Sequence, residues 1–128
     1  MPHGTLEALT GVKERRLWPV HLMPSYFASK VGAKLLKQAG RNAEDIDLLI
    51  YAGVCRDFIE PATAHVIHHT LKLSPNCMAF DLSNACVGFF NAMVLSAQMI
   101  EAKEELLDRI VVVAVQLKRH RLQSLVYK

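Results

Sequence analysis

The stretch CMAFDLSNACVGFFNAMVLSAQMI, residues 77–100, decides the fold of this chain. Its first part, CMAFDLS, is typical of a β-strand, and SNAC makes a tight connection into a long helix expected from about Cys86 to Glu105. Within VGFFNAMVLSAQMI only Asn91, Ser96 and Gln98 are clearly polar. Because a helix that is apolar nearly all round is buried nearly all round, this segment predicts a central helix that contacts more than one layer of protein.

Helices and strands alternate on both sides of this stretch. Upstream, the pattern predicts a helix from about Ser25 to Gln38, with Pro24 at its start and Gly40 as its C-terminal cap. A buried strand at LLIYAGV (residues 48–54), a loop at CRDFIEP (55–61) and a second helix from Pro61 to about Leu71 follow. Downstream, RIVVVAV (109–115) predicts another strand. Strands separated by helices of this length pair in parallel, so the sequence predicts an α/β fold.

A sheet covers only one side of a helix, and this chain has little left to cover the other. Leaving Phe89, Phe90, Met93, Val94 and Met99 in water costs about 1.5 to 3 kcal/mol each. We therefore expect the native assembly to be larger than these 128 residues.

The composition narrows the class of protein. The chain has 128 residues, 52% of them hydrophobic, and a net charge of +3, which fits one folded domain. No segment interleaves basic and aromatic residues, so we expect no nucleic-acid partner. No apolar run is long and uninterrupted enough for a membrane span. Three cysteines without a CxxC pair indicate reduced thiols and a cytoplasmic setting.

Cys86 is the candidate that the position itself suggests. It stands at a strand-to-helix turn, where unpaired backbone N–H groups and the positive end of the helix dipole favour a thiolate. Ala85 and Gly88 leave room beside the sulfur. A buried structural cysteine is the alternative that position and flanks leave open. Cys55 and Cys77 fit the structural role better.

Three segments resemble one enzyme family. DLSNACVGFFNAM (residues 81–93) is similar to the nucleophile segment of thiolase-superfamily condensing enzymes, especially the ketoacyl-acyl-carrier-protein synthase III group. TGVKERR (10–16) resembles the early TGI-type segment of that group, and AGRNAEDIDLLIYAGV (39–54) resembles its helix and strand. The resemblance spans about residues 8–115 and implies a thiolase-like fold, with Cys86 as the nucleophile that accepts the acyl group.

CRDFIEPATA (residues 55–64) is similar to a loop of the OleA-type enzymes, which join two acyl-CoA molecules head to head. The resemblance implies that Glu60 reaches the partner subunit's active site and acts there as a general base. A carboxylate whose pKa is raised by desolvation suits the removal of a proton beside a thioester. The alternative is a solvated loop acid. Arg56 and Asp57 would order this loop as an ion pair, or form a plain surface pair.

The resemblance also fixes what we expect of the whole protein. It implies a homodimer that takes acyl-CoA or an acyl-carrier protein, with no cofactor and no metal. Residues 1–115 would form most of the first αβα half of the fold, and 116–128 would be a divergent tail. The second half, with the His and Asn that complete the family's active site, is missing, so this chain alone would be inactive. The alternatives are a synthase III that uses malonyl-carrier protein and a non-catalytic fragment or interface module.

Other residues are weaker candidates. His65, His68 and His69 have a spacing that can hold a metal on a helix, but no acidic or Cys ligand accompanies them. Asn84 is expected to shape the turn before Cys86. The cations of TGVKERR would meet the phosphates of coenzyme A or stay solvated: Lys13, Arg15 and Arg16.

Overall fold

The computed structural model describes residues 4–14, 18–102 and 110–113. A short helix, α1 (Thr5–Thr10), precedes α2 (Pro24–Ala39) and the 3₁₀ turn η1 (Ala43–Asp45). Strand β1 (Leu48–Tyr51), helix α3 (Thr63–Leu71) and strand β2 (Met78–Asp81) follow. A second 3₁₀ turn, η2 (Ala85–Val87), leads directly into α4 (Gly88–Ala102), and β3 is Ile110–Val113. The expected Glu105 end of the long helix and the 116–128 tail lie outside the described residues.

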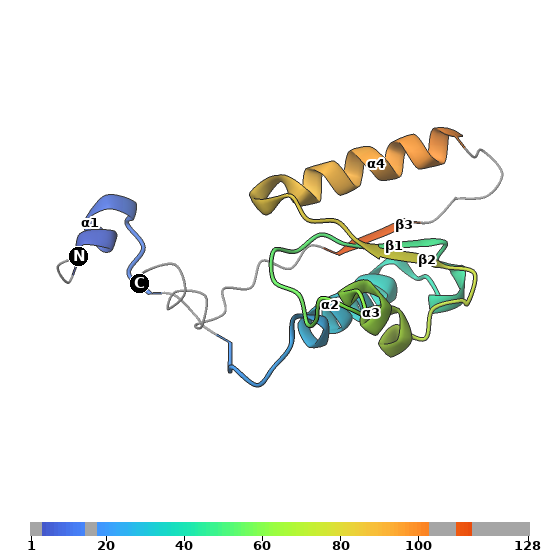
Figure 1. Cartoon of the computed structure of the whole chain (residues 1–128), viewed down its shortest axis with the longest axis horizontal. Helices are drawn as coiled ribbons and strands as arrows, with labels where there is room; N and C mark the ends of the chain where they lie inside the picture. The colour runs from blue at the N-terminus through green and yellow to red at the C-terminus, as the bar shows by residue number, and fades with distance from the viewer. Residues whose placement is uncertain (1–3, 15–17, 103–109, 114–128) are drawn as a thin grey trace.

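The three strands form one parallel sheet in the order β2-β1-β3. Leu48 of β1 pairs with Met78 of β2 and with Ile110 of β3. Figure 1 shows α2 and α3 on one face of the sheet and α4 on the other. The predicted α/β class with parallel strands is confirmed, and the central place of β1 explains its unbroken apolar sequence.

Alternate side chains of β1 enter two separate cores. Leu49 and Tyr51 belong to the core beneath α2 and α3, where Ile67 is fully buried. Leu48 and Ile50 belong to the core beneath α4. Both faces of β1 are therefore covered, which is the condition for a parallel sheet to be stable.

The ends of α2 follow its sequence signals. Pro24 occupies the first helical turn, where its missing N–H costs nothing. At the other end Gly40 adopts φ 62°, and its N–H donates to the carbonyls of Leu36 and Lys37. This left-handed cap is the role predicted for Gly40.

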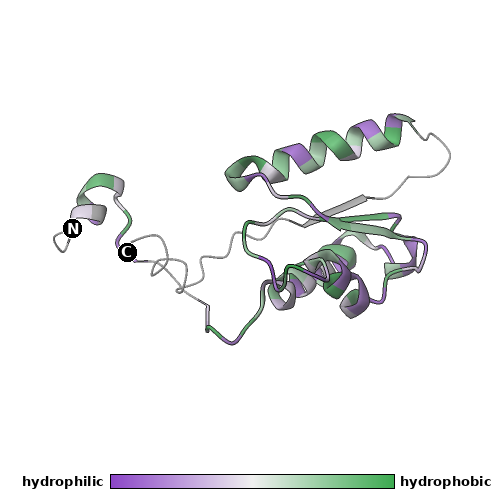
Figure 2. Ribbon diagram, in the orientation of Figure 1, coloured by the Kyte–Doolittle hydropathy of each residue, from purple (hydrophilic) through white to green (hydrophobic). Residues whose placement is uncertain are grey.

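Helix α4 is covered on one side only. Its buried residues, Gly88, Ala92 and Ser96, lie four positions apart and so form one narrow face. The opposite side exposes large apolar side chains, with Phe90 64% and Val94 57% exposed; hydrophobic bands recur along α4 in Figure 2. The expected central helix is thus half open within this chain, because no layer of the described chain covers its outer face.

The hydropathy of α4 also meets the requirement for a membrane span. By length and composition alone, Ala85–Ala102 is apolar enough to cross a bilayer, with a mean hydropathy of 1.3 and 17% of it buried. Ala92, however, packs into the core on the sheet together with Leu48 and Ile50. Such a contact is made by a core helix, and a core helix also passes this test of length and composition.

The Tyr51 ring leaves no space for a side chain larger than that of glycine at position 53. A β-carbon at Gly53 would overlap the Tyr51 ring and hydroxyl, and that side chain is fully buried with its hydroxyl bonded to the Cys55 carbonyl. We expect Gly53→Ala to lower the free energy of unfolding by about 1 to 3 kcal/mol, measured by urea unfolding. Gly88→Ala is the matched control, because its β-carbon would meet its nearest atom at an ordinary 3.7 Å. Equal stability of the two variants would contradict this account.

Candidate active site

Glu60 and Cys86 follow the carboxyl ends of neighbouring strands. The segment 52–62, which carries Glu60, leaves β1 after Tyr51, and the turn with Cys86 leaves β2 after Asp81. Because β1 and β2 are parallel neighbours, both segments start from the same edge of the sheet. Ligands of open α/β sheets bind at that edge.

The sulfur of Cys86 is exposed at the start of the α4 region. The thiol lies in the η2 turn, two residues before the first residue of α4 at Gly88. The expected helix start at Cys86 is therefore two residues early, since a 3₁₀ turn comes first. The positive end of the α4 dipole lies beside this turn.

The backbone before Cys86 turns sharply. Ala85 has φ 41°, in the left-handed region, which costs a residue with a side chain about 1 to 2 kcal/mol. The Asn84 carbonyl accepts from the Val87 N–H at 3.0 Å, and the Asn84 side-chain amide donates to Asn91 Oδ1 at 2.6 Å. Asn84 thus ties the turn to the first part of α4, as the sequence predicted.

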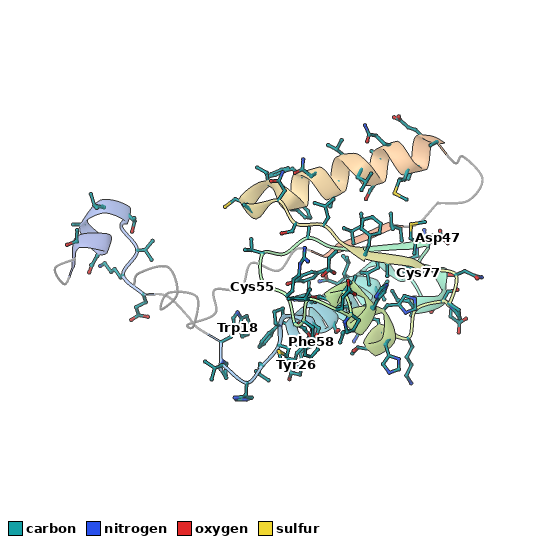
Figure 3. The ribbon with its side chains drawn as sticks, in the orientation of Figure 1. Trp18, Tyr26, Asp47, Cys55, Phe58 and Cys77 are labelled. Atoms are coloured by element: carbon teal, nitrogen blue, oxygen red, sulfur yellow. The ribbon has the colours of Figure 1, made fainter. Side chains whose placement is uncertain are left out.

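Glu60 is exposed in the segment between β1 and α3. Its apolar neighbours are exposed as well, with Phe58 at 52% and Ile59 at 88%. Figure 3 shows Phe58 on the same side of the fold as Trp18 and Tyr26. Glu60 therefore stands next to an exposed apolar pair of side chains.

The base of this loop is tied down by hydrogen bonds. The Tyr51 hydroxyl donates to the Cys55 carbonyl at 2.6 Å, and the Asp57 N–H donates to Thr63 Oγ1 at 3.2 Å. The Asp57 carboxylate accepts from the Ser25 N–H at 3.0 Å, at the start of α2. Burial, followed by the nearby Cys55, Asp57 and Asp81, raises the pKa of Tyr51, so its hydroxyl remains a donor at neutral pH.

Asp81 is the residue that sequence reasoning missed. Its carboxylate, 7% exposed, accepts from the N–H groups of Thr63 at 3.0 Å and Ala64 at 2.8 Å, at the start of α3. Arg56 Nε lies 3.9 Å from the same carboxylate. The motif around Cys86 includes this Asp, but its partners are 17 and 18 positions away in sequence and give no local signal.

Two expectations about the loop are wrong. Arg56 pairs with Asp81 and not with Asp57, because Asp57 instead caps α2. Pro61 does not start the second helix: α3 begins at Thr63, and the Glu60–Pro61 peptide bond is cis. Asp81 supplies the helix-start signal that the sequence reading assigned to Pro61.

The remaining candidates stay outside this arrangement. Among the described residues no group of three or more His, Cys, Asp or Glu could hold a metal ion, and His68 Nε2 lies 2.9 Å from the Ser74 carbonyl. Lys13 is exposed, whereas Arg15 and Arg16 lie outside the described residues.

The three cysteines differ in their exposure, which gives a direct check of the structure. Cys55 and Cys77 are buried and Cys86 is exposed. Burial, with Asp47 nearby (Figure 3), raises the pKa of Cys77 from 9.0 to about 11. We expect iodoacetamide at pH 8 to label Cys86 first in this folded chain, and Cys55 and Cys77 at a comparable rate only in denaturant, as read by peptide mass spectrometry. Faster labelling of Cys77 than of Cys86 would contradict the structure.

The raised pKa of Cys77 also predicts a loss of stability in alkali. Burial favours the neutral thiol, so this contribution to stability is complete below the thiol's ordinary pKa of 9.0 and declines as the pH rises towards 11. Cys77→Ala should flatten the dependence of the unfolding midpoint on pH in that window. If the unfolding midpoint of Cys77→Ala depended on pH as that of the unsubstituted chain does, groups other than Cys77 would cause the loss of stability in alkali.

Comparison with curated proteins gives partial matches to two named groups of enzymes, and no family model matches the sequence. The chain is 40% identical over 96 residues to the acyl-CoA:acyl-CoA alkyltransferase of Xanthomonas campestris, and 39% identical over 101 residues to that of Shewanella oneidensis. It is 38% identical over 94 residues to the β-ketoacyl-[acyl-carrier-protein] synthase III of Chlorobaculum tepidum. These matches cover 73% to 79% of this chain, but the chain spans only 28% to 29% of those relatives.

Solved structures match the fold over more of the chain. Xanthomonas campestris OleA superposes with a TM-score of 0.80 at 38% identity, over 85% of this chain and 32% of that one. The 3-oxoacyl-(acyl carrier protein) synthase III of Xanthomonas oryzae gives a TM-score of 0.80 at 37% identity, with the same coverage. The predicted thiolase-like fold is confirmed by these likenesses. The solved OleA variants include changes of one glutamate and of one cysteine that lie 26 positions apart in that protein, and the cysteine variant holds lauric acid and lauroyl-CoA.

Proposed function

We propose that this chain, a homologue of the acyl-CoA:acyl-CoA alkyltransferases and the synthases III, is part of an acyltransferase that condenses two acyl thioesters. The observation that carries the proposal is the exposed Cys86 thiol at the turn from β2 into α4. A thiol at such a turn is accessible to an acyl thioester. The proposal concerns the complete protein, because this chain spans less than a third of its relatives.

The first step is acyl transfer to Cys86. The thiolate attacks the carbonyl carbon of an acyl-CoA, the bond to the coenzyme A sulfur breaks, and coenzyme A leaves as a thiol after taking up a proton. The product of this step is an acyl thioester on Cys86. No cofactor is required, because neither carbon nor sulfur changes its oxidation state.

The second step forms the carbon–carbon bond. Glu60 of a neighbouring subunit removes a proton from the α-carbon of a second acyl-CoA, and that carbon attacks the Cys86 thioester. The Cys86 thiolate leaves, and a β-ketoacyl-CoA is the product. The exposed apolar Phe58 and Ile59 beside Glu60 support entry of this loop into another subunit of a homodimer.

The spacing of the two residues also supports their pairing. Glu60 precedes Cys86 by 26 positions, the interval between the varied glutamate and cysteine of the solved OleA structures. The runner-up is a synthase III reaction, in which decarboxylation of a malonyl-carrier protein supplies the carbanion and Glu60 has no part as base. The identity of 38% to a relative named as a synthase III supports this alternative.

The test is to give the complete protein lauroyl-CoA alone. We expect an acyl mass increment on the Cys86 peptide and a β-keto product without any malonyl donor. Product that forms only when malonyl-carrier protein is added would replace the head-to-head reaction with the synthase III reaction. Absence of an acyl adduct on Cys86 with either donor would overturn both.

A further inference from the structure

The exposed Glu60 side chain has no hydrogen bond or ion pair within the described parts of the chain. Its position therefore depends on the backbone of its loop. A group that acts by geometry must be held by a rigid support, since a misplacement of about 1 Å can cost 10²-fold in rate. The support of this loop comes from two carboxylates that are not candidates for chemistry.

Asp57 fixes the first end of the Glu60 segment. Its carboxylate accepts from the Ser25 N–H at 3.0 Å and so joins the loop to the start of α2. Only two residues lie between Asp57 and Glu60 in the sequence, so the acid stays close to the anchor. Ser25 is buried, so water competes poorly for this bond.

Asp81 fixes the second end of the segment. Both of its oxygens accept from the first N–H groups of α3, those of Thr63 and Ala64, and Arg56 lies beside it. Thr63 is fully buried and joins the two anchors, because its N–H donates to Asp81 while its hydroxyl accepts from the Asp57 N–H.

Asp81 also connects this loop to the nucleophile. It is the last residue of β2, and Cys86 follows five positions later on the same segment. The Asp81 side chain thus fixes the end of the Glu60 loop close to the point where the Cys86 turn begins.

We propose that Asp57 and Asp81 are positioning residues, which set the geometry of the Glu60 loop relative to the sheet edge from which the Cys86 turn starts. The inference rests on the proposed role of Glu60 in the second step. Neither carboxylate contacts substrate in this account; both act through the backbone.

The test separates the two steps in Asp57→Ala, measured in the complete protein with lauroyl-CoA. We expect β-keto product from the acylated enzyme to form about tenfold or more slowly, while the rate of Cys86 acylation stays within about twofold. Asp57→Asn should recover most of the second step, because its amide oxygen still accepts from the Ser25 N–H. Hydrogen exchange of residues 55–62 should be faster in Asp57→Ala than in Asp57→Asn.

Asp45→Ala is the matched control. Asp45 also caps a helical turn, accepting from the Asn42 N–H at 3.1 Å, but it precedes β1 and so lies at the opposite edge of the sheet. An equal loss in both steps for Asp57→Ala, or an unchanged second step, would overturn the positioning role. If the unsubstituted protein forms no adduct on Cys86, the proposed function fails. Faster hydrogen exchange of residues 55–62 in Asp57→Ala would still support the role of Asp57 in holding the loop. Unchanged hydrogen exchange would overturn that role.

Discussion

We expect Cys86→Ser to abolish the proposed acyl loading in the complete protein, with a fall of about 10³-fold or more in the rate of coenzyme A release. A serine hydroxyl has nearly the same size as the thiol, so the exposed turn before α4 accepts it without repacking. The hydroxyl is a much weaker nucleophile, because an alcohol gives up its proton far less readily than a thiol does. The rate of this step is measured directly by the release of coenzyme A, which a thiol-specific reagent detects.

Cys77→Ala is the control for this prediction. Cys77 is buried next to the start of β2, at the edge of the sheet opposite the Cys86 turn, so its loss should lower stability and leave acyl loading intact. Acyl loading by Cys86→Ser at the rate of the unsubstituted protein would show that another group is the acceptor. An adduct on a buried cysteine would point to the same conclusion.

The order of elements could be predicted from the sequence because local patterns decide it. Leu48 to Tyr51 are apolar without interruption, and the sheet buries all four. Gly40 ends α2 through a conformation that other residues adopt at a cost. These signals reside in the residues that form each element, so they can be read before the fold is known.

The ends of α3 and α4 could not be predicted in the same way. Asp81 caps α3 across a separation of 17 to 18 residues, so the helix starts at Thr63 although Pro61 gives the stronger local signal. Ala85 takes a left-handed conformation that favours glycine, and an alanine in the sequence gives no signal of this conformation. Both features arise from tertiary contacts at the sheet edge where the candidate residues lie.

The half-open α4 supports the expected assembly of this chain with further protein. Phe90, Met93 and Val94 are each about half exposed or more, although the sequence of the helix is that of a buried element. Covering such side chains contributes about 1.5 to 3 kcal/mol each, so the exposed face favours a further layer of protein. This face lies on the side of the sheet away from α2 and α3 (Figure 1).

Glu60→Gln separates the second step from the first. The amide keeps the size of the acid but cannot take a proton, so we expect β-keto product to form 10²- to 10⁴-fold more slowly, about the contribution of a general base. Acylation of Cys86 should change by less than about twofold. Glu44→Gln is the matched control, because Glu44 is an exposed acid in η1, at the opposite edge of the sheet. Equal effects of the two substitutions would remove Glu60 from the reaction.

If the complete protein forms the proposed homodimer, mixed dimers decide whether Glu60 acts in the neighbouring subunit. In a dimer that pairs Cys86→Ser with Glu60→Gln, one site keeps both an intact cysteine and the partner's intact glutamate if the acid acts in the neighbouring subunit. A random equal mixture of the two inactive variants should then regain about a quarter of the activity, since half of the dimers are mixed and each has one complete site. If Glu60 serves its own subunit, no site in the mixture is complete and activity stays at the level of the single variants. The exposed Phe58 and Ile59 favour the first outcome, because a loop with an apolar tip is stabilised by entering a neighbouring surface.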